Sequence, residues 1–326
     1  MNPRERVKVG RTALTVTRFG LGTAPLAGLF EEVPEPQGIS VIERAWDDGI
    51  RFFDTAPLYG HGLAELRVGK ALRHEPRDAY TLASKVGRLL RADAPPEPGQ
   101  QYRGTPPVNP VFDFTYDGVM RSFHESLERL GLERIDILHI HDPDDHHDAA
   151  IAGAYKALDR LRADGVIGAV GAGMNQAEML MRFAREANFD CFLLAGRYTL
   201  LDQAALKELL PECAARGISI IAGGVYNSGI LADPKPGAHY NYQTAPAELL
   251  ERAQRIRDVC DRHRIPLKAA AVQFPLGHPA VTSVVVGCRS TAQLDESLRM
   301  FEVEIPAALW DELKAERLLP PEAPTP

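Results

Sequence analysis

The sequence has no closely spaced cysteines, no long apolar run and no concentration of basic residues. Its cysteines are Cys191, Cys213, Cys260 and Cys288, and no C-x-x-C pair is present, which argues against a thiol redox motif or a zinc site. No apolar run approaches the roughly 18 residues that cross a membrane. The first residues, M-N-P-R-E-R-V-K, carry charge but no apolar segment, so we expect no secretory signal and a cytoplasmic protein.

Positive charge is also in deficit. The formal net charge over 326 residues is -7, which works against binding to a polyanion such as nucleic acid. Hydrophobic residues make up 45% and charged residues 25% of the chain, as in an ordinary globular protein with a large core. We expect no nucleic-acid partner and no membrane association, and the sequence leaves a monomer and a homo-oligomer both open.

A complete dinucleotide-binding fingerprint is missing as well. A Rossmann domain shows G-x-G-x-x-G after its first strand. Here Gly20 and Gly22 are followed by T-A-P, and the later G-A-G-M-N-Q from Gly171 also lacks the third glycine. Neither stretch supports a Rossmann site.

Strand-like and helix-like segments alternate eight times along the chain. The strand-like segments are residues 18–23, 51–55, 80–86, 135–141, 165–172, 191–195, 218–224 and 281–287. The helix-like segments are residues 38–48, 64–73, 117–130, 149–163, 176–187, 204–216, 247–263 and 292–300. Because a helix between two strands enforces parallel pairing and a right-handed crossover, this α/β pattern favours a closed (β/α)8 TIM barrel over an open doubly wound sheet.

Several segments lie outside this alternation. Residues 5–17 predict an N-terminal β-hairpin that acts as a lid or plug, with Gly10 in its turn. Residues 88–114 and 225–244 predict long βα loops, the first structureless and the second suited either to a sugar-like ligand or to packing on itself. We expect a single barrel domain at 1–316 and a disordered proline-rich tail at 317–326.

Four proton-handling side chains follow successive strand-like segments. Asp54 ends one segment and Tyr59 lies five residues later, while Lys85 and His141 close the next two. Because the carboxyl ends of barrel strands face a common mouth, we expect these four side chains to converge. Such a set suits proton transfer at a carbonyl or alcohol oxygen.

Charge arithmetic distributes the roles within this set. A free tyrosine has a pKa near ~10, so use near neutrality requires a shift of about 2 to 3 units. One positive charge about 4 Å away, at an effective dielectric of about 20, supplies ~4 kcal/mol, which is enough. Lys85 is therefore expected to activate Tyr59, Asp54 to keep Lys85 charged, and His141 to hydrogen-bond the reacting oxygen. His139 shares a strand face with His141, and we expect it to be structural.

Each residue also has a plain structural interpretation. An Asp after a strand often caps a helix, a Lys at a strand end usually snorkels, and a buried His is most often a satisfied core residue. The run from His141 to Asp148, H-D-P-D-D-H-H-D, mixes imidazoles and carboxylates, but consecutive loop residues rarely face one ion. We interpret it as an acidic helix start and expect no metal.

Three motifs together carry a family resemblance. Asp54-T-A-P-L-Tyr59-Gly60, the strand ending near Lys85, and D-I-L-H-I-H-D-P around His141 resemble the aldo-keto reductase superfamily over nearly the whole chain. The resemblance implies a (β/α)8 barrel whose Asp, Tyr, Lys and His interconvert carbonyls and alcohols with a nicotinamide cofactor. Tyr59 would be the general base in oxidation and the general acid in reduction.

More narrowly, Y-R-G-T-P-P-V-N-P, G-A-G-M-N-Q and L-L-A-G-R-Y-T-L-L-D-Q resemble the D-threo-aldose 1-dehydrogenase group, which includes L-fucose dehydrogenases. This implies oxidation of the anomeric hydroxyl of an aldose, such as L-fucose or D-arabinose, to a lactone with NAD(P)+. Three alternatives stay open: a pyridoxal dehydrogenase, an NADPH-dependent aldehyde or ketone reductase, and a non-catalytic nicotinamide-sensing subunit.

The resemblance also implies a set of cofactor contacts. The nicotinamide would stack near Tyr198. The family's Ser-Asn pair, which holds the carboxamide, falls at Gly173 and Met174 on direct alignment, so Asn175 would take this role by a one-residue shift. The loop after the seventh strand would meet the phosphates through Gly224, Val225, Asn227, Gly229 and Leu231.

The adenosine end would use the G-x-R-S form at Gly287, Arg289 and Ser290. Gln293 stands where many NADPH-preferring members carry an arginine, and Glu296 stands in the adenine-binding position. Because glutamine cannot grip a 2′-phosphate as a guanidinium does, we expect NAD to be favoured over NADP.

Overall fold

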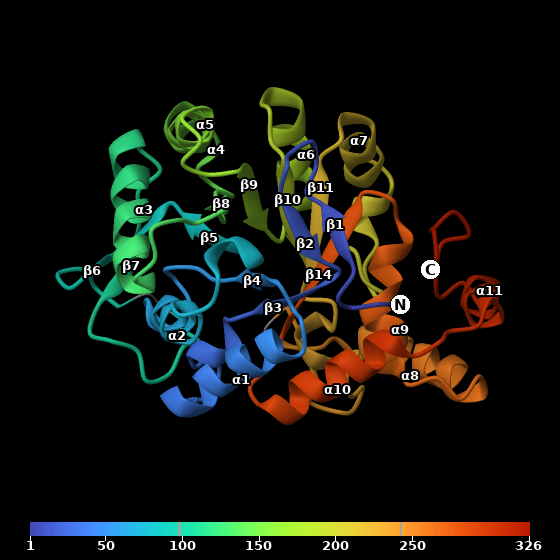
Figure 1. The fold of residues 1–326 in the computed structure, drawn as a ribbon. Coiled ribbons are helices and arrows are strands. Elements are labelled where there is room, and N and C mark those ends of the chain that lie inside the picture. Colours follow the sequence, from blue (N-terminus) through green and yellow to red (C-terminus); the bar gives the residue numbers. More distant parts are fainter. Residues whose placement is uncertain (97–98, 242) are drawn as a thin grey trace.

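Eight parallel strands close into a barrel in the computed structural model, which describes residues 1–96, 99–241 and 243–326 (Figure 1). The barrel strands are β3 (Phe19–Gly22), β4 (Phe52–Asp54), β5 (Thr81–Val86), β8 (Ile137–His141), β9 (Ala169–Met174), β10 (Cys191–Ala195), β11 (Ser219–Gly223) and β14 (Val281–Gly287). The last strand pairs with the first, with Val284 opposite Phe19, so the sheet has no free edge. The predicted (β/α)8 barrel is confirmed.

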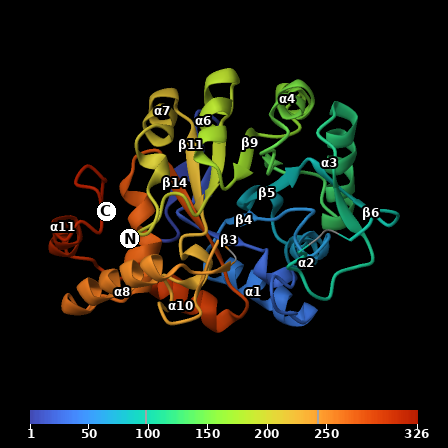
Figure 2. The same cartoon turned by 180° about the vertical axis from the view of Figure 1, so that it is seen from behind.

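Helices surround the barrel and connect its strands (Figure 2). The helices are α1 (Glu35–Asp47), α2 (Leu63–Leu72), α3 (Tyr116–Leu130), α4 (His147–Ala149), α5 (Lys156–Ala163), α6 (Ala177–Glu186), α7 (Leu209–Arg216), α8 (Ala247–Arg262), α9 (Leu267–Gln273), α10 (Thr291–Glu302) and α11 (Ala307–Ala315). A π-helix, η3 (Ala150–Tyr155), joins α4 to α5. Among the described residues, no helix is both long and apolar enough to cross a membrane.

Local signals explain where helices begin and end. The Thr115 hydroxyl accepts a hydrogen bond from the Gly118 amide at 3.1 Å and caps α3. The same helix ends at Gly131, whose φ of 61° is a left-handed conformation that glycine adopts without strain. Caps of this kind satisfy backbone groups that a helix leaves unpaired at its ends.

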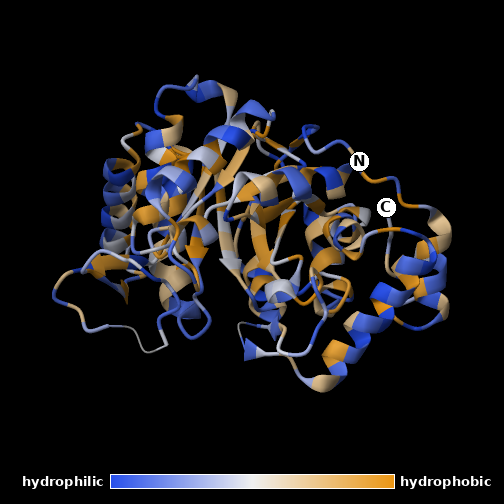
Figure 3. Ribbon diagram, turned by 90° about the horizontal axis from the view of Figure 1, so that it is seen from below, coloured by the Kyte–Doolittle hydropathy of each residue, from blue (hydrophilic) through white to orange (hydrophobic). Residues whose placement is uncertain are grey.

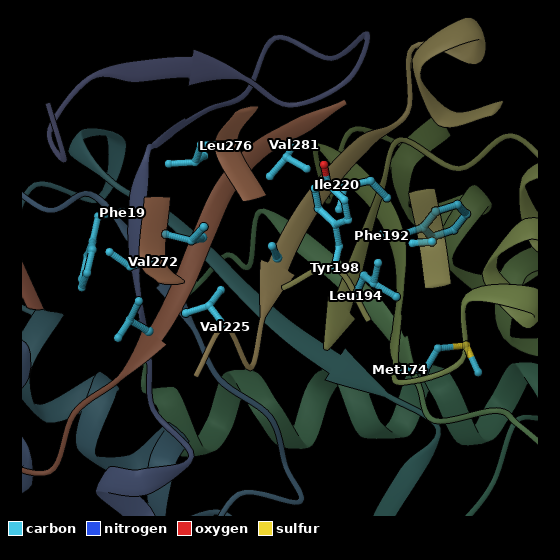
Figure 4. Packing of buried hydrophobic residues seen from close by; sticks show 14 of the residues in the cluster. Phe19, Met174, Phe192, Leu194, Tyr198, Ile220, Val225, Val272, Leu276 and Val281 are labelled. Atoms are coloured by element: carbon cyan, nitrogen blue, oxygen red, sulfur yellow. The ribbon is translucent and has the colours of Figure 1, made fainter. Parts of the chain in front are cut away.

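Two cores hold the layers together. One lies between the barrel and its helices and contains Phe19, Met174, Phe192 and Ile220 (Figure 4). The other fills the barrel interior and includes Phe52. Figure 3 shows hydrophobic residues gathered on the strands and on the inner sides of the helices, with hydrophilic residues outside. This arrangement is expected when each strand is covered on both faces.

The predicted N-terminal hairpin is present and acts as a plug. β1 (Arg6–Lys8) pairs antiparallel with β2 (Thr15–Thr17), and Val9 and Val16 pack into the barrel-interior core. Gly10 has a φ of 52°, and a Cβ there would lie 2.4 Å from the Asp190 carbonyl oxygen. The turn therefore needs glycine for both conformation and space.

The two long loops differ from expectation. Residues 88–114 are not structureless, because β6 (Arg88–Arg91) pairs antiparallel with β7 (Asn109–Phe112). The second loop contains the short pair β12 (His239–Tyr240) and β13 (Gln243–Thr244). Positions 97, 98 and 242, which fall in these loops, lie outside the described residues.

The C-terminal segment is also packed rather than disordered. Leu318 and Leu319 are 1% and 2% exposed, and Thr325 lies against Gly277. The expected disorder of residues 317–326 is therefore not what the structure shows. The segment's prolines fit an extended chain, and its two leucines give it apolar surface to bury.

Candidate active site

The structure brings the four predicted proton-handling residues together at one end of the barrel. Asp54 is the last residue of β4, Lys85 lies near the end of β5, and His141 is the last residue of β8. Tyr59 follows β4 on a loop. Because neighbouring parallel strands end side by side, their terminal side chains share one mouth, as the sequence predicted.

Lys85 is the centre of this group. Its ammonium donates to both carboxylate oxygens of Asp54 at 2.8 Å and to the Thr55 carbonyl oxygen at 2.9 Å. Only 1% of Lys85 is exposed. Burial raises the pKa of Asp54, and the Lys85 ammonium opposes that rise. Bidentate contact with an ammonium is the partnership that a buried carboxylate needs to stay ionised.

Tyr59 lies over this ion pair. The Lys85 ammonium is 4.7 Å from the centroid of the Tyr59 ring. Tyr59 is half-buried, whereas Asp54 and Lys85 are buried. The phenol is thus the member of the set that an incoming molecule can reach, with a positive charge behind it.

His141 lies edge-on to Tyr59, with ring centroids 5.9 Å apart and planes at 85°. Burial, followed by the charges of Lys85 and Arg88, lowers the pKa of His141 well below its usual range. A neutral imidazole at physiological pH offers one N–H donor to a bound oxygen. His139 is fully buried one pleat behind it, and burial lowers the pKa of His139 to about 3, which agrees with a structural residue.

A cavity of about 480 Å³ opens beside Tyr59 and runs toward the start of α10. The predicted cofactor residues that line it are Asn175, Gly224, Val225, Asn227, Gly229, Gly287, Arg289, Gln293 and Glu296. Met174 is instead turned into the helix-side core. The one-residue shift from Met174 to Asn175 is therefore consistent with the geometry.

Three predicted residues do not line this cavity. Ser290 caps α10, Leu231 is buried in the core, and Tyr198 is only 1% exposed. The Tyr198 ring packs on Phe274, with centroids 5.1 Å apart, among the core side chains of Figure 4. A ring enclosed in this way presents no face to a nicotinamide, so the expected stacking on Tyr198 is corrected.

The α10 end of the cavity suits an anion. The Ser290 hydroxyl accepts a hydrogen bond from the Gln293 amide at 3.3 Å, and the Gln293 side chain accepts one from the Arg289 amide at 2.8 Å. Arg289 Nε is buried without a hydrogen-bond partner among the described residues. A helix N-terminus with an unsatisfied guanidinium N–H beside it matches a phosphate group.

The loop after β11 supplies further room for a bound group. Gly224 has a φ of 61°, and a Cβ there would lie 3.1 Å from the Gly196 amide nitrogen. Asn227 donates to the Gly196 carbonyl oxygen at 3.1 Å, while its own side-chain oxygen is buried without a partner among the described residues. A backbone that approaches closely and an unpaired acceptor fit a dinucleotide lying along this wall.

Lys268 is a cavity residue that sequence reasoning missed. It lies near the start of α9, and its ammonium contacts both carboxylate oxygens of Glu296 at 2.9 Å. The available signal was a lone lysine in the apolar run L-K-A-A-A-V, a long way in sequence from the other site residues. Tyr226 and Ser297 also line the cavity; Tyr226 lies within the loop expected to meet the phosphates, and Ser297 directly follows Glu296.

The β6–β7 loop reaches across the mouth. Tyr102 forms an isolated bridge with Leu29, and its ring centroid lies 6.3 Å from that of Tyr59. The Arg103 amide donates to the Gly28 carbonyl oxygen at 2.9 Å. The loop therefore forms part of the wall around the candidate active site.

The sequence of this chain is similar to those of known oxidoreductases. The model of the aldo/keto reductase family matches residues 18–316. D-threo-aldose 1-dehydrogenase from Pseudomonas sp is 44% identical, with 94% of this chain and 96% of that protein covered. Pyridoxal 4-dehydrogenase from Microbacterium luteolum is 43% identical, with 97% and 98% covered.

Solved structures agree in fold. An aldo-keto reductase from Bacillus halodurans superposes with a TM-score of 0.76 at 24% identity, covering 96% of each chain. A glycerol dehydrogenase from Gluconobacter oxydans gives 0.74 at 23% identity, covering 97% of each. The sequence relatives show that this chain is an oxidoreductase with a nicotinamide cofactor, which sets aside the non-catalytic alternative. The chain belongs to the aldo/keto reductase family.

Proposed function

We propose that this enzyme oxidises the anomeric hydroxyl of an aldose, of the L-fucose or D-arabinose type, to a lactone. The observation that carries the proposal is the buried Lys85–Asp54 ion pair lying 4.7 Å from the Tyr59 ring. It supports Tyr59 as the group that takes up a proton near neutral pH. The 44% identical D-threo-aldose 1-dehydrogenase supports the substrate class.

In the proposed oxidation, the proton of the anomeric hydroxyl passes to the Tyr59 phenolate, and a hydride leaves the anomeric carbon. A nicotinamide held beside Asn175 in the cavity would supply the acceptor for that hydride, so the carbon would lose two electrons and become a carbonyl. Lys85 stabilises the phenolate before transfer, and His141 donates a hydrogen bond to the reacting oxygen. Carbonyl reduction runs the same steps in reverse, with Tyr59 as the acid.

We also propose that NAD+ is preferred to NADP+. A 2′-phosphate is best gripped by a charged fork, and Gln293 is neutral. Two cations lie near it among the described residues that line this end of the cavity. The Arg289 guanidinium already donates to the Leu29 carbonyl oxygen at 3.0 Å, and both oxygens of Glu296 hold the Lys268 ammonium. Dissociation constants measured by quenching of protein fluorescence test this preference. NAD+ is expected to bind several-fold more tightly, and tighter NADP+ binding contradicts it.

Pyridoxal oxidation is the second candidate, supported by the 43% identical pyridoxal 4-dehydrogenase. The deciding experiment measures kcat/KM with NAD+ for a panel of aldoses, pyridoxal and simple alcohols, with identification of the product. The proposal expects the highest values for aldoses and a lactone product. Higher kcat/KM for pyridoxal than for every aldose refutes the assignment. Efficient NADPH-dependent reduction of simple aldehydes, with no aldose oxidation, identifies a reductase instead.

A further inference from the structure

An acidic residue that is not one of the four predicted proton-handling residues lies beside His141. Asp142 directly follows β8, and its carboxylate lies 3.5 Å from His141 Nε2. The other ring nitrogen, Nδ1, is buried without a hydrogen-bond partner among the described residues. Nε2 is therefore the nitrogen that faces Asp142, and any oxygen bound at Nε2 has the Asp142 carboxylate as a neighbour.

The backbone is bent to hold this carboxylate in place. Asp142 has a φ of 44°, a left-handed conformation that non-glycine residues seldom adopt. Its amide donates to the Gly173 carbonyl oxygen at 3.0 Å, which ties the bend to the end of β9. Strained backbone of this kind persists where surrounding contacts maintain it, and it is frequent at ligand-binding positions.

The β6–β7 hairpin supplies the partner of Asp142. Arg88 lies at the start of β6 and contacts the Asp142 carboxylate at 3.1 Å. Its guanidinium lies over the ring of Phe112, its cross-strand partner, 4.3 Å from the centroid. The Arg88 and Asp142 side chains are 10% and 28% exposed. Burial raises the pKa of Asp142 to about 6, so the carboxylate is largely ionised at neutral pH.

We propose that Asp142, positioned by Arg88, binds the hydroxyl on the carbon next to the reacting carbon, and so selects substrates that carry this hydroxyl. An ionised carboxylate only accepts hydrogen bonds, so it suits a neutral hydroxyl better than an oxygen that becomes negatively charged. The reacting oxygen belongs to Tyr59 and His141, and oxygens on adjacent sugar carbons lie within hydrogen-bonding reach of one another. The inference rests on the proposed use of Tyr59 and His141 and names the feature by which an aldose is recognised.

The test compares a good aldose substrate with its 2-deoxy analogue in wild type and in Asp142→Asn. The variant is expected to lose roughly 10- to 100-fold in kcat/KM for the aldose, mainly through KM, because it loses a hydrogen bond to a charged acceptor. The 2-deoxy sugar, which lacks the bonded group, is expected to change by less than about threefold. Equal losses for both sugars, or no loss for either, overturn the proposal.

Two further variants separate recognition from folding. Asp145→Asn removes the same charge from an exposed position three residues along the loop. It is expected to leave unchanged the ratio of kcat/KM for the aldose to kcat/KM for its 2-deoxy analogue. Arg88→Lys keeps the charge but loses the planar fork, so it is expected to reduce the ratio partially. A ratio that falls as far in Asp145→Asn as in Asp142→Asn overturns the proposal.

The inference also has a test that does not need aldose oxidation. In the reductive direction, glyceraldehyde carries the neighbouring hydroxyl and propionaldehyde lacks it. Wild type is expected to favour glyceraldehyde, and Asp142→Asn is expected to remove that preference. If no aldose is oxidised but this preference is present and lost in the variant, the aldose proposal fails and the Asp142 inference stands. A preference unaffected by the substitution overturns the inference alone.

Discussion

Replacing Lys85 with methionine removes the positive charge beside Tyr59 while keeping most of the side-chain volume. The ammonium lies 4.7 Å from the Tyr59 ring centroid. At an effective dielectric of about 20, two unit charges about 4 to 5 Å apart interact by roughly 3 to 4 kcal/mol, which corresponds to about 2 to 3 pH units. Asp54 cancels part of this field in the wild type. We therefore expect the acidic limb of the pH profile for oxidation to move by about one to two units.

The direction of the shift follows from the sign of the charge. A cation favours the phenolate, so without Lys85 the phenolate forms only at higher pH and the limb moves to the alkaline side. With the ammonium gone, only burial acts on Asp54, and burial raises its pKa, so we expect this carboxyl to take up a proton in the variant. Activity at pH 7 is then expected to fall about 10- to 100-fold.

The assay is kcat/KM for aldose oxidation between pH 6 and pH 10, with the NAD+ dissociation constant measured on the same sample. Lys70→Met is the matched control, because Lys70 is exposed and pairs with Glu35 on the surface. The control is expected to leave the profile unchanged. A Lys85→Met profile whose limb does not move, or an equal loss of NAD+ affinity and activity, refutes the reasoning.

Three further predictions concern other parts of the molecule. His141→Gln is expected to lower kcat by about 100-fold with unchanged NAD+ affinity, measured by steady-state kinetics and fluorescence quenching; a loss below threefold contradicts its role. Gln293→Arg is expected to tighten NADP+ binding about tenfold by adding a phosphate fork, measured by calorimetry, and unchanged affinity contradicts the predicted cofactor end. Leu318→Ala is expected to lower the free energy of unfolding by about 2 to 5 kcal/mol, because Leu318 is 1% exposed; a urea titration with no change indicates a loose tail.

The barrel was predictable because each strand and helix can be recognised from the residues of its own short segment. The segments 191–195 and 281–287 match β10 and β14 residue for residue. The convergence of the four proton-handling residues was predictable for the same reason, because side chains at the carboxyl ends of neighbouring barrel strands face one mouth. These inferences need only the order of elements and the side-chain chemistry at their ends.

The features in which the structure differs from the prediction depend on contacts between distant parts of the chain. The β6–β7 pairing joins Arg88 to Phe112 across a proline-rich segment with no alternating pattern, so it was not foreseen. The orientation of the Tyr198 ring depends on its packing against Phe274, which cannot be inferred from the neighbouring sequence. Lys268 contacts Glu296 only because α9 packs on α10. Tertiary packing therefore determines the β6–β7 pairing, the ring orientation and the Lys268–Glu296 contact.

The most direct test of the account is the activity of Tyr59→Phe. This substitution removes the phenolic oxygen and leaves the ring, its contacts with Tyr102 and His141, and the Lys85–Asp54 pair in place. The account predicts that kcat/KM for the best aldose falls by about 100-fold or more while NAD+ affinity is unchanged. A purified variant that binds NAD+ normally and keeps more than about a tenth of wild-type kcat/KM would contradict the role of Tyr59 in proton transfer.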